Sequence, residues 1–223
     1  MLSYDKAPTA YHGTVLPYNN SNSNSASSSS SSPTTPTQRL ARKMSQRDRH
    51  VFVVYGPAGC GKTTIAQYIS KAFNFTYIEG DNYHPQSNVE KMSRNIPLQD
   101  ADRWDWLINL REAAVAALEQ DVDGVVLTCS ALKKKYRDVI RIASINEHSV
   151  HVHFLCLQAD RATLIKRVTA RKDHFMGQKM VDSQLRDLEP IGSRETDVVP
   201  IDVRGTQAEN EKLAEAAVVS ILS

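Results

Sequence analysis

The 223-residue sequence has no long apolar run, no paired cysteines and no large excess of charge of one sign. No stretch approaches the roughly 18 consecutive apolar residues that a membrane-spanning helix requires. The three cysteines, Cys60, Cys129 and Cys156, include no Cys-x-x-Cys pair, so neither a disulfide framework nor a zinc site is expected. We therefore predict a reduced, cytoplasmic protein with no membrane partner.

Signals for export or organelle import are also weak. The first residues, MLSYDKAPTAYHG, lack the basic start and apolar core of a secretory signal. Only Lys6 is basic before Arg39, and no amphipathic stripe appears. This disfavours a mitochondrial presequence, although the segment is rich in serine and poor in acidic residues.

The charge is nearly balanced, with 27 Lys and Arg residues against 25 Asp and Glu residues. Residues 1–50 hold six basic and two acidic residues, so the rest of the chain carries 21 basic and 23 acidic residues. Binding to nucleic acid by counterion release needs a basic face. We therefore expect no nucleic-acid partner.

The N-terminal region has low sequence complexity. Residues 17–38 are almost entirely Ser, Asn, Thr and Pro, and they contain almost nothing that could be buried to offset the entropy of ordering. We predict that residues 1–49 form a disordered Ser-rich tail and that residues 50–223 form one folded domain. Ser-Pro and Thr-Pro pairs in the tail could be phosphorylated, but they also arise from composition alone, so an inert extension is the favoured interpretation.

From His50 onward, apolar strand-like segments alternate with helical ones. Strands are expected at 51–55, 75–79, 124–130, 150–157 and 197–203. Helices are expected at 62–73, 103–120, 133–144, 160–170 and along an apolar stripe that ends at Leu222. The alternation predicts an α/β fold, in which a mostly parallel five-stranded sheet is covered by helices on both faces. Pro200 suggests that the last strand lies at an edge.

The segment GPAGCGKT, at 56–63, matches the phosphate-loop pattern G-x-x-x-x-G-K-[ST] between an expected strand and an expected helix. Its glycines let backbone N–H groups point at phosphate oxygens, and the helix N-terminus adds a positive dipole end. Lys62 is expected to reach the β and γ phosphates, and Thr63 to coordinate Mg²⁺. We therefore predict a three-layer P-loop NTPase fold that binds ATP or GTP through Gly56, Pro57, Ala58, Gly59, Cys60, Gly61, Lys62, Thr63 and Thr64.

The position of the acidic residues distinguishes between uses of the nucleotide. Hydrolytic P-loop proteins usually carry a carboxylate at the end of a later strand, but the strand at 124–128 runs into Thr128-Cys129-Ser130. The acids follow the second strand instead, in Glu79-Gly80-Asp81. Ligands gather at this edge of a parallel sheet. Asp81 could orient an acceptor hydroxyl and take its proton, or it could simply cap a turn.

Five segments in order resemble the gluconokinase family of small P-loop kinases, a group that also includes shikimate kinase. They are EGDNYHPQSNVEKM (79–92), IPLQDADRWDWL (96–107), CSALKKKYRD (129–138), ARKDHFM (170–176) and QLRDLEP (184–190). Glu79 departs from the usual Asp of the family, and Asp173 stands where many members have Gly. The match covers nearly all of residues 51–203.

The resemblance implies ATP-dependent phosphorylation of D-gluconate at its 6-hydroxyl, giving 6-phosphogluconate for the pentose phosphate pathway. It implies Lys62, Asp81 and Arg171 as catalytic residues, with a mobile lid at about 167–179. Arg167 and Arg204 are expected on the ATP side, and Thr63 with Glu79, the latter through water, on Mg²⁺. The implied substrate-binding residues are Asp81, His84, Arg103, Ser130, Lys133, Arg137, His174 and Gln184. Dimers are common in this family, so a homodimer is one expected assembly.

Other interpretations of these residues stay open at this point. His84 before Pro85 could close a turn, Arg103 could pair locally with Asp100 or Asp102, and the Lys run at 133–135 could be a solvated helix start. Trp104 and Trp106 are expected to pack in the core or under the lid. The protein could also be a related kinase with another acceptor, which the HPxxN and CSALK segments disfavour. A nucleotide-driven switch or a nucleic-acid ATPase is disfavoured by the missing strand-end carboxylate and the balanced charge.

Overall fold

The computed structural model describes residues 48–94, 96–120, 122–170 and 177–223. Predictions about the tail before residue 48, about Arg171 and about His174 therefore concern residues outside the described part of the chain. The strands are β1 (Arg49–Tyr55), β2 (Thr76–Ile78), β3 (Gly124–Cys129), β4 (Val150–Gln158) and β5 (Val198–Asp202). The helices are α2 (Lys62–Phe73), the 3-10 helix η1 (Gly80–Tyr83), α3 (Gln86–Ser93), α4 (Asp100–Leu118), α5 (Lys134–Asn146), α6 (Arg161–Thr169), α7 (Gly177–Asp187) and α8 (Gln207–Leu222).

The five strands form one sheet in the order β2-β3-β1-β4-β5, and every adjacent pair is parallel. The central strand β1 is buried from Val51 to Tyr55, which explains why its sequence is continuously apolar rather than alternating. Pro200 lies on β5 at the edge of the sheet, as predicted. A proline is tolerated there because it removes no hydrogen bond from an inner ladder.

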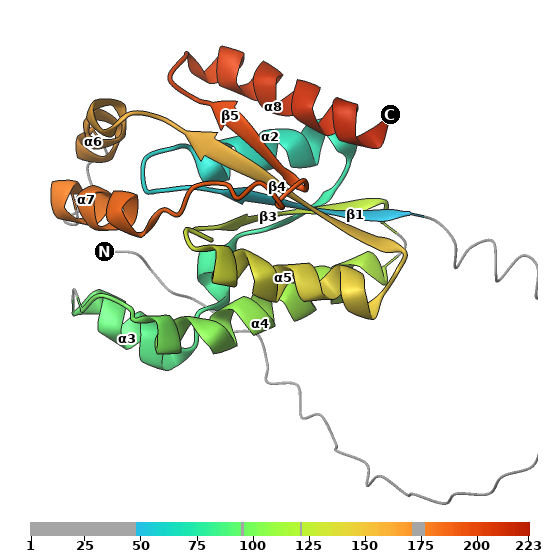
Figure 1. Ribbon diagram of the computed structural model, residues 1–223, viewed down its shortest axis with the longest axis horizontal. Coiled ribbons are helices and arrows are strands. Elements are labelled where there is room, and N and C mark those ends of the chain that lie inside the picture. The colour runs from blue at the N-terminus through green and yellow to red at the C-terminus, as the bar shows by residue number, and fades with distance from the viewer. Residues whose placement is uncertain (1–47, 95, 121, 171–176) are drawn as a thin grey trace, which may run out of the picture.

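Helices cover both faces of the sheet, which confirms the predicted three layers (Figure 1). On one face, Trp106, Leu107 and Leu110 of α4 pack with α5 against alternate residues of β1 and β3. On the other face, α2, α6 and α8 pack around Phe52 and Val54. Because all strands run the same way, their carboxyl ends meet at one edge, where α3, α6 and α7 also lie in Figure 1.

Several helices begin where the sequence pattern did not place them. Helix α4 starts at Asp100 rather than at 103, because Gln99 and Asp102 form a reciprocal capping box. Helix α8 starts at Gln207, well ahead of its apolar stripe, through a second capping box of Thr206 and Glu209. Helix α3 was not predicted at all. In the described part of the chain, none of the helices is long and apolar enough to span a bilayer.

Candidate active site

The phosphate loop joins β1 to α2 and depends on glycine at three positions. Gly56, Gly59 and Gly61 have φ angles of 147°, 84° and 95°, a region that other residues rarely adopt. A side chain at Gly56 would also place its Cβ 2.8 Å from the carbonyl oxygen of Leu157 on β4. The first turn of α2 contains no acidic residue, so nothing there opposes an anion at its N-terminus.

The side chains at this loop are held by backbone groups. The Lys62 ammonium donates to the carbonyl oxygens of Gly56 (3.1 Å) and Pro57 (3.2 Å) and so lies across the loop. The backbone N–H of Ala58 donates to the side-chain oxygen of Gln184 on α7 at 2.6 Å. Gln184 was predicted on the substrate side, but the structure brings it to the phosphate loop.

Two residues predicted to serve a metal ion lie together. The Thr63 hydroxyl donates to Oε2 of Glu79 at 3.0 Å. A hydroxyl and a carboxylate are ligand types that Mg²⁺ takes, usually with nucleotide phosphates and water completing its shell. No group of three or more His, Cys, Asp or Glu residues in the described regions could hold a metal ion by itself. A divalent ion here would therefore also depend on phosphate oxygens.

Gly80, between the two acidic residues, is held against the end of β3. Its N–H donates to the hydroxyl of Thr128 at 3.0 Å, and its carbonyl accepts a hydrogen bond from the indole N–H of Trp106 at 2.8 Å. A Cβ at this position would lie 1.9 Å from the carbonyl oxygen of Thr128. Glycine is therefore required for η1 to approach β3, and this fixes where Glu79 and Asp81 stand.

The buried thiol of Cys129, at the end of β3, lies within electrostatic reach of Asp81, Lys62 and Arg103. The pKa of Cys129 is raised to about 12, mainly by burial and also by the charge of Asp81, against the opposing effects of a backbone hydrogen bond from Ala131 and of the cations Lys62 and Arg103. These three side chains are thus close enough to the thiol to affect its titration. Ser130, the next residue, is half-buried at the same edge. A candidate base and two candidate cations thus act electrostatically on the same end of β3.

The His84 ring stacks on the indole of Trp106, with centroids 4.1 Å apart and planes inclined by 17°. Its Nδ1 lies 3.3 Å from the Asn88 amide nitrogen, which also donates to the carbonyl oxygen of Asp102 at 2.6 Å. Burial, and then the nearby charge of Arg103, lower the pKa of His84 to about 4. His84 is therefore neutral at pH 7 and offers hydrogen bonds rather than charge.

Arg103 and Lys133 line a polar pocket of about 400 Å³. Lys133 is already neutralised, because its ammonium lies 3.0 Å from Asp100 and 3.7 Å from Asp187. Arg103 donates only to the carbonyl oxygen of Leu98, at 3.3 Å, and forms no ion pair with any described residue. The other lining residues are Pro97, Leu98, Gln99, Asp100, Ala101, Tyr136 and Asp187.

Comparisons with known proteins agree with this geometry. A sequence family described as an AAA domain matches residues 51–191. A protein of Schizosaccharomyces pombe named probable gluconokinase is 48% identical over 169 residues, which cover 75% of this chain and 87% of that protein. The chain belongs to the gluconokinase family. The thermosensitive gluconokinase of Escherichia coli is 37% identical over 170 residues, covering 76% of this chain and 88% of that enzyme.

A solved structure supports the same assignment. The crystal structure of a gluconokinase from Sinorhizobium meliloti 1021 matches with a TM-score of 0.68 at 34% identity, covering 78% of this chain and 94% of that one. The P-loop kinase fold and the kinase activity class predicted from the motifs are thereby confirmed. The fold of this family implies use of a nucleotide, and the loop that begins at Gly56 is the segment that matches the phosphate-loop pattern.

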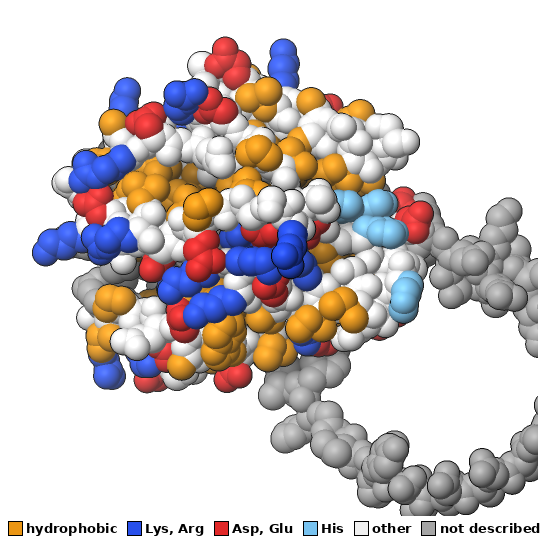
Figure 2. Space-filling model, viewed as in Figure 1, with side chains coloured by type: hydrophobic (Ala, Val, Ile, Leu, Met, Phe, Trp, Pro, Cys, Tyr) orange, Lys and Arg blue, Asp and Glu red, His pale blue; other side chains and the backbone are white. Residues whose placement is uncertain are grey.

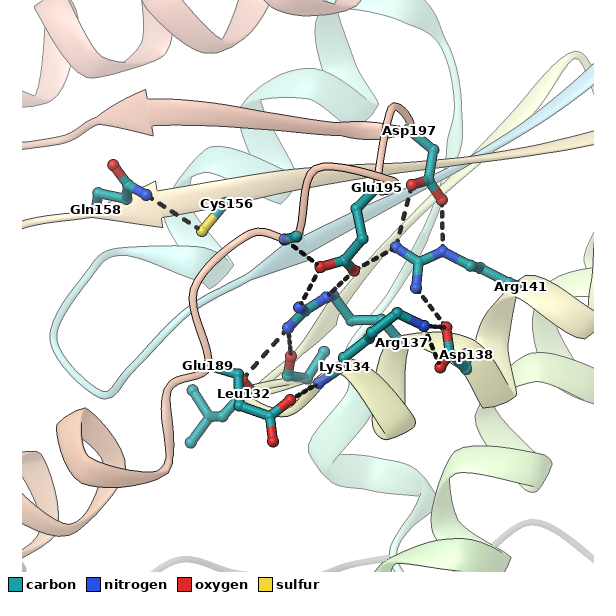
Figure 3. A network of polar contacts seen from close by, with 12 residues as sticks. Leu132, Lys134, Arg137, Asp138, Arg141, Cys156, Gln158, Glu189, Glu195 and Asp197 are labelled. Atoms are coloured by element: carbon teal, nitrogen blue, oxygen red, sulfur yellow. Dashed lines mark hydrogen bonds and ion pairs between the residues drawn. The ribbon is translucent and has the colours of Figure 1, made fainter.

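The prediction that Arg137 binds substrate is wrong, because its side chain is completely buried. Its guanidinium lies in a network of polar contacts within the protein (Figure 3). It donates to both carboxylate oxygens of Glu195 at 2.8 Å and to the carbonyl oxygens of Ala131 and Leu132. These hydrogen bonds lower the pKa of Glu195 to about 2. Arg137 thus ties α5 to the segment that leads into β5, which is a structural role.

Around that pair, Arg141 bridges to Glu195 at 2.7 Å and to Asp197 at 2.6 Å. Lys134 instead pairs with Asp138 on the exposed surface of α5, so part of the Lys run is a solvated helix start. On the face shown in Figure 2, basic and acidic side chains are interspersed rather than segregated. Trp106 is buried in the core, as expected.

Local pairing of Arg103, the alternative left open by the sequence, does not occur. Asp102 is held by Lys91 at 2.5 Å and by the N–H of Gln99 at 2.9 Å. Asp100 accepts hydrogen bonds from Lys133, Lys135 and Tyr136. Both acids are therefore engaged elsewhere, and among the described residues the Arg103 guanidinium contacts the Leu98 carbonyl and lies 5.6 Å from the centroid of the Tyr136 ring.

Near the loop after β5, where the nucleotide base was predicted to bind, Arg167 forms hydrogen bonds with backbone carbonyl groups. Its guanidinium donates to the carbonyl oxygens of Val203 (2.7 Å) and Gly205 (3.2 Å), and so holds the loop after β5. Arg204 forms an ion pair with Asp202 at 2.5 Å on the exposed surface. An open hollow of about 760 Å³ beside this loop is lined by Asp202, Arg204, Gly205, Glu209, Asn210, Lys212 and Leu213.

Sequence reasoning missed two hydroxyl residues that contact Glu79. The Tyr77 hydroxyl donates to Oε2 at 2.5 Å, and the Thr128 hydroxyl donates to Oε1. Burial and the hydrogen bond to Glu79 raise the pKa of Tyr77, so the phenol stays protonated and donates. The spacing of Tyr77 and Glu79, two residues apart along an extended strand, was the available signal.

Proposed function

We propose that this protein transfers the γ-phosphoryl group of ATP to the 6-hydroxyl of D-gluconate, with Mg²⁺ as cofactor. The observation that carries the proposal is the position of Glu79-Gly80-Asp81 beside the phosphate loop, where Thr63 contacts Glu79 and Gly80 contacts Thr128 of β3, in a chain of the gluconokinase family. A kinase for a sugar acid needs a cation for the phosphates, a base for the acceptor hydroxyl and a cation for the carboxylate, and Lys62, Asp81 and Arg103 are our candidates for these roles. The gluconokinases of the same family act as precedent.

The chemistry follows from the positions of the side chains. Asp81 accepts the proton of the 6-hydroxyl as its oxygen bonds to the γ-phosphorus and the bond to the ADP oxygen breaks. Lys62, released from its contacts with the loop carbonyls, neutralises the charge on the transferring group. A bound Mg²⁺ would supply further positive charge at the phosphate oxygens. Thr63 and Glu79 are the residues that would hold it.

Arg103 is the residue that we assign to the gluconate carboxylate. A guanidinium can bind a carboxylate through two parallel hydrogen bonds, and Arg103 has no competing ion pair among the described side chains. Lys133 is a weaker candidate because Asp100 and Asp187 already balance its charge. His84, neutral at pH 7, offers hydrogen bonds to hydroxyls without repelling Arg103.

The proposal is tested by measuring ADP release with D-gluconate, other sugar acids, shikimate and D-glucitol, an alcohol that lacks the carboxylate. We expect D-gluconate to have the highest kcat/KM, and phosphorus and carbon NMR of the product to show phosphate on the terminal carbon. Preference for another acid, or phosphate on another carbon, would contradict the assignment. ADP release without any acceptor would indicate a nucleotide hydrolase.

The role of Arg103 is tested by Arg103→Met. The KM for D-gluconate should rise at least tenfold, which corresponds to about 1.4 kcal/mol, while the preference over D-glucitol shrinks. Lys134→Met removes an exposed cation of α5 and serves as the control. Equal preference for D-gluconate in Arg103→Met and the parent protein would exclude Arg103 as the carboxylate partner.

The cellular location and the oligomeric state of the protein are part of the same proposal. We expect a cytoplasmic homodimer that supplies 6-phosphogluconate to the pentose phosphate pathway, as the family resemblance implies. Sedimentation velocity of the purified protein at micromolar concentration distinguishes a monomer of 24.9 kDa from a dimer.

A further inference from the structure

The Glu79 carboxylate accepts hydrogen bonds from three hydroxyl groups. Oε2 accepts from Thr63 at 3.0 Å and from Tyr77 at 2.5 Å, while Oε1 accepts from Thr128. Thr63 belongs to the phosphate loop, Tyr77 to β2 and Thr128 to β3. The carboxylate therefore joins three separate elements at the place where a metal ion would bind.

Tyr77 is placed for this contact by the strand itself. Alternate side chains of a strand point to the same face, so Tyr77 and Glu79 share one face while Ile78 is buried on the other. The Tyr77 ring packs against the apolar cluster of Phe52 and Phe75, which restricts its rotation. Its hydroxyl is thus held by packing of the ring, independently of Glu79.

The length of the Glu79 side chain explains why its carboxylate needs hydrogen-bond donors to fix its orientation. The related motif has Asp at this position, whereas Glu79 has one more methylene group and one more rotatable bond. A longer carboxylate has more orientations available and loses more entropy on being fixed. Donors on both of its oxygens restrict those orientations.

We propose that Tyr77 is a positioning residue for the metal site, holding the Glu79 carboxylate beside Thr63 so that it can accept hydrogen bonds from metal-bound water. The inference rests on the proposed Mg²⁺ site. When the Thr63 hydroxyl turns its oxygen toward the ion, its hydrogen bond to Glu79 changes, whereas the contact from Tyr77 does not depend on the ion. Such outer partners typically affect metal affinity about 10- to 100-fold.

The test is Tyr77→Phe, which keeps the ring and removes only the hydroxyl. Binding of Mn²⁺ to the enzyme–ADP complex is measured by electron paramagnetic resonance, with no acceptor present. We expect the Kd for Mn²⁺ to rise about tenfold, with the Mg²⁺ concentration for half-maximal turnover rising alike and the KM for the acceptor unchanged. Because the Mn²⁺ measurement needs no acceptor, it is unaffected if the proposed acceptor is wrong.

The matched control is Tyr68→Phe. Tyr68 of α2 donates to Glu215 of α8 at 2.6 Å, the same kind of pair away from the phosphate loop. Its removal should leave the Kd for Mn²⁺ unchanged. A change of less than twofold in Tyr77→Phe, or an equal change in both variants, would overturn the proposal.

A second variant separates positioning from packing. Glu79→Asp retracts the carboxylate from Tyr77, so adding Tyr77→Phe should then have little further effect on the Kd for Mn²⁺. The effects of substitutions at interacting residues are non-additive in this way, whereas the effects at independent residues add. Full additivity of the two substitutions would show that Tyr77 does not act through Glu79.

Discussion

The side-chain oxygen of Gln184 accepts a hydrogen bond from the backbone N–H of Ala58 at 2.6 Å, across 126 positions of the sequence. The contact joins α7 to the phosphate loop. An N–H of a loop that binds phosphate is thereby satisfied by a neutral oxygen. The position of α7 and the conformation of the loop are coupled through this bond.

The first prediction follows from that contact. Gln184→Glu preserves an acceptor for Ala58 but adds a negative charge beside the loop, so ATP affinity should fall about tenfold. Calorimetric titration with ATP measures the change, which should shrink at high salt. Gln178→Glu makes the same substitution at an exposed position of α7 and should bind ATP normally. Similar losses in the two variants would contradict a specific role for position 184.

Asp81→Asn tests the proposed base. Asparagine keeps the shape but cannot take the proton, so kcat should fall on the order of 10²- to 10⁴-fold while the Kd for ATP stays within about twofold. Steady-state kinetics and nucleotide titration separate the two quantities. Asp105→Asn, on the exposed side of α4, is the control. Loss of ATP affinity with normal turnover at saturation would instead make Asp81 a metal residue.

Arg137→Ala tests the structural role that replaces the predicted substrate contact. It removes the buried partner that binds both oxygens of Glu195 and leaves Arg141 as the remaining cation, which costs about 3–5 kcal/mol and lowers Tm by about 10 °C. Lys134→Ala removes an exposed partner of Asp138 and should cost less than about 1 kcal/mol. Thermal unfolding of the two variants and the parent protein measures these losses of stability. An unchanged Tm combined with a raised KM for gluconate would restore Arg137 to the substrate site.

Acid sensitivity should arise partly from Glu195. Its pKa falls from 4.5 to about 2 on folding, so at low pH the unfolded chain binds the proton more readily than the folded one. Ionised Glu195 therefore contributes about 3 kcal/mol to the free energy of unfolding above pH 4.5, and this contribution is lost as the pH falls toward 2. Urea unfolding at pH 6, 4.5 and 3.5 should show a shallower decline in Glu195→Gln than in the parent protein. If the free energy of unfolding falls equally with pH in both proteins, Glu195 is not a source of the acid sensitivity.

The sequence was informative wherever the signal is local. The phosphate loop lies within eight consecutive positions between a strand and a helix, and the edge strand carries its own proline at 200. Residues whose partners are distant were placed wrongly or missed. Arg137 meets Glu195 58 positions away, and Glu79 meets Thr128 49 positions away. A guanidinium in a motif looks the same whether its partner is a substrate or a buried carboxylate, and only the tertiary structure decides between them.

The close approach of Gly80 to Thr128 has a consequence for anyone who redesigns the acceptor range of this enzyme. Since even a methyl group at residue 80 would collide with the strand, the backbone that carries Glu79 and Asp81 cannot be reshaped by substitution there. If the polar pocket binds the acceptor as we propose, variation is instead available at side chains that line it, such as Gln99, Arg103 and Lys133. A library that varies those three positions and leaves Gly80 untouched should alter acceptor preference while the backbone that carries the two carboxylates is preserved.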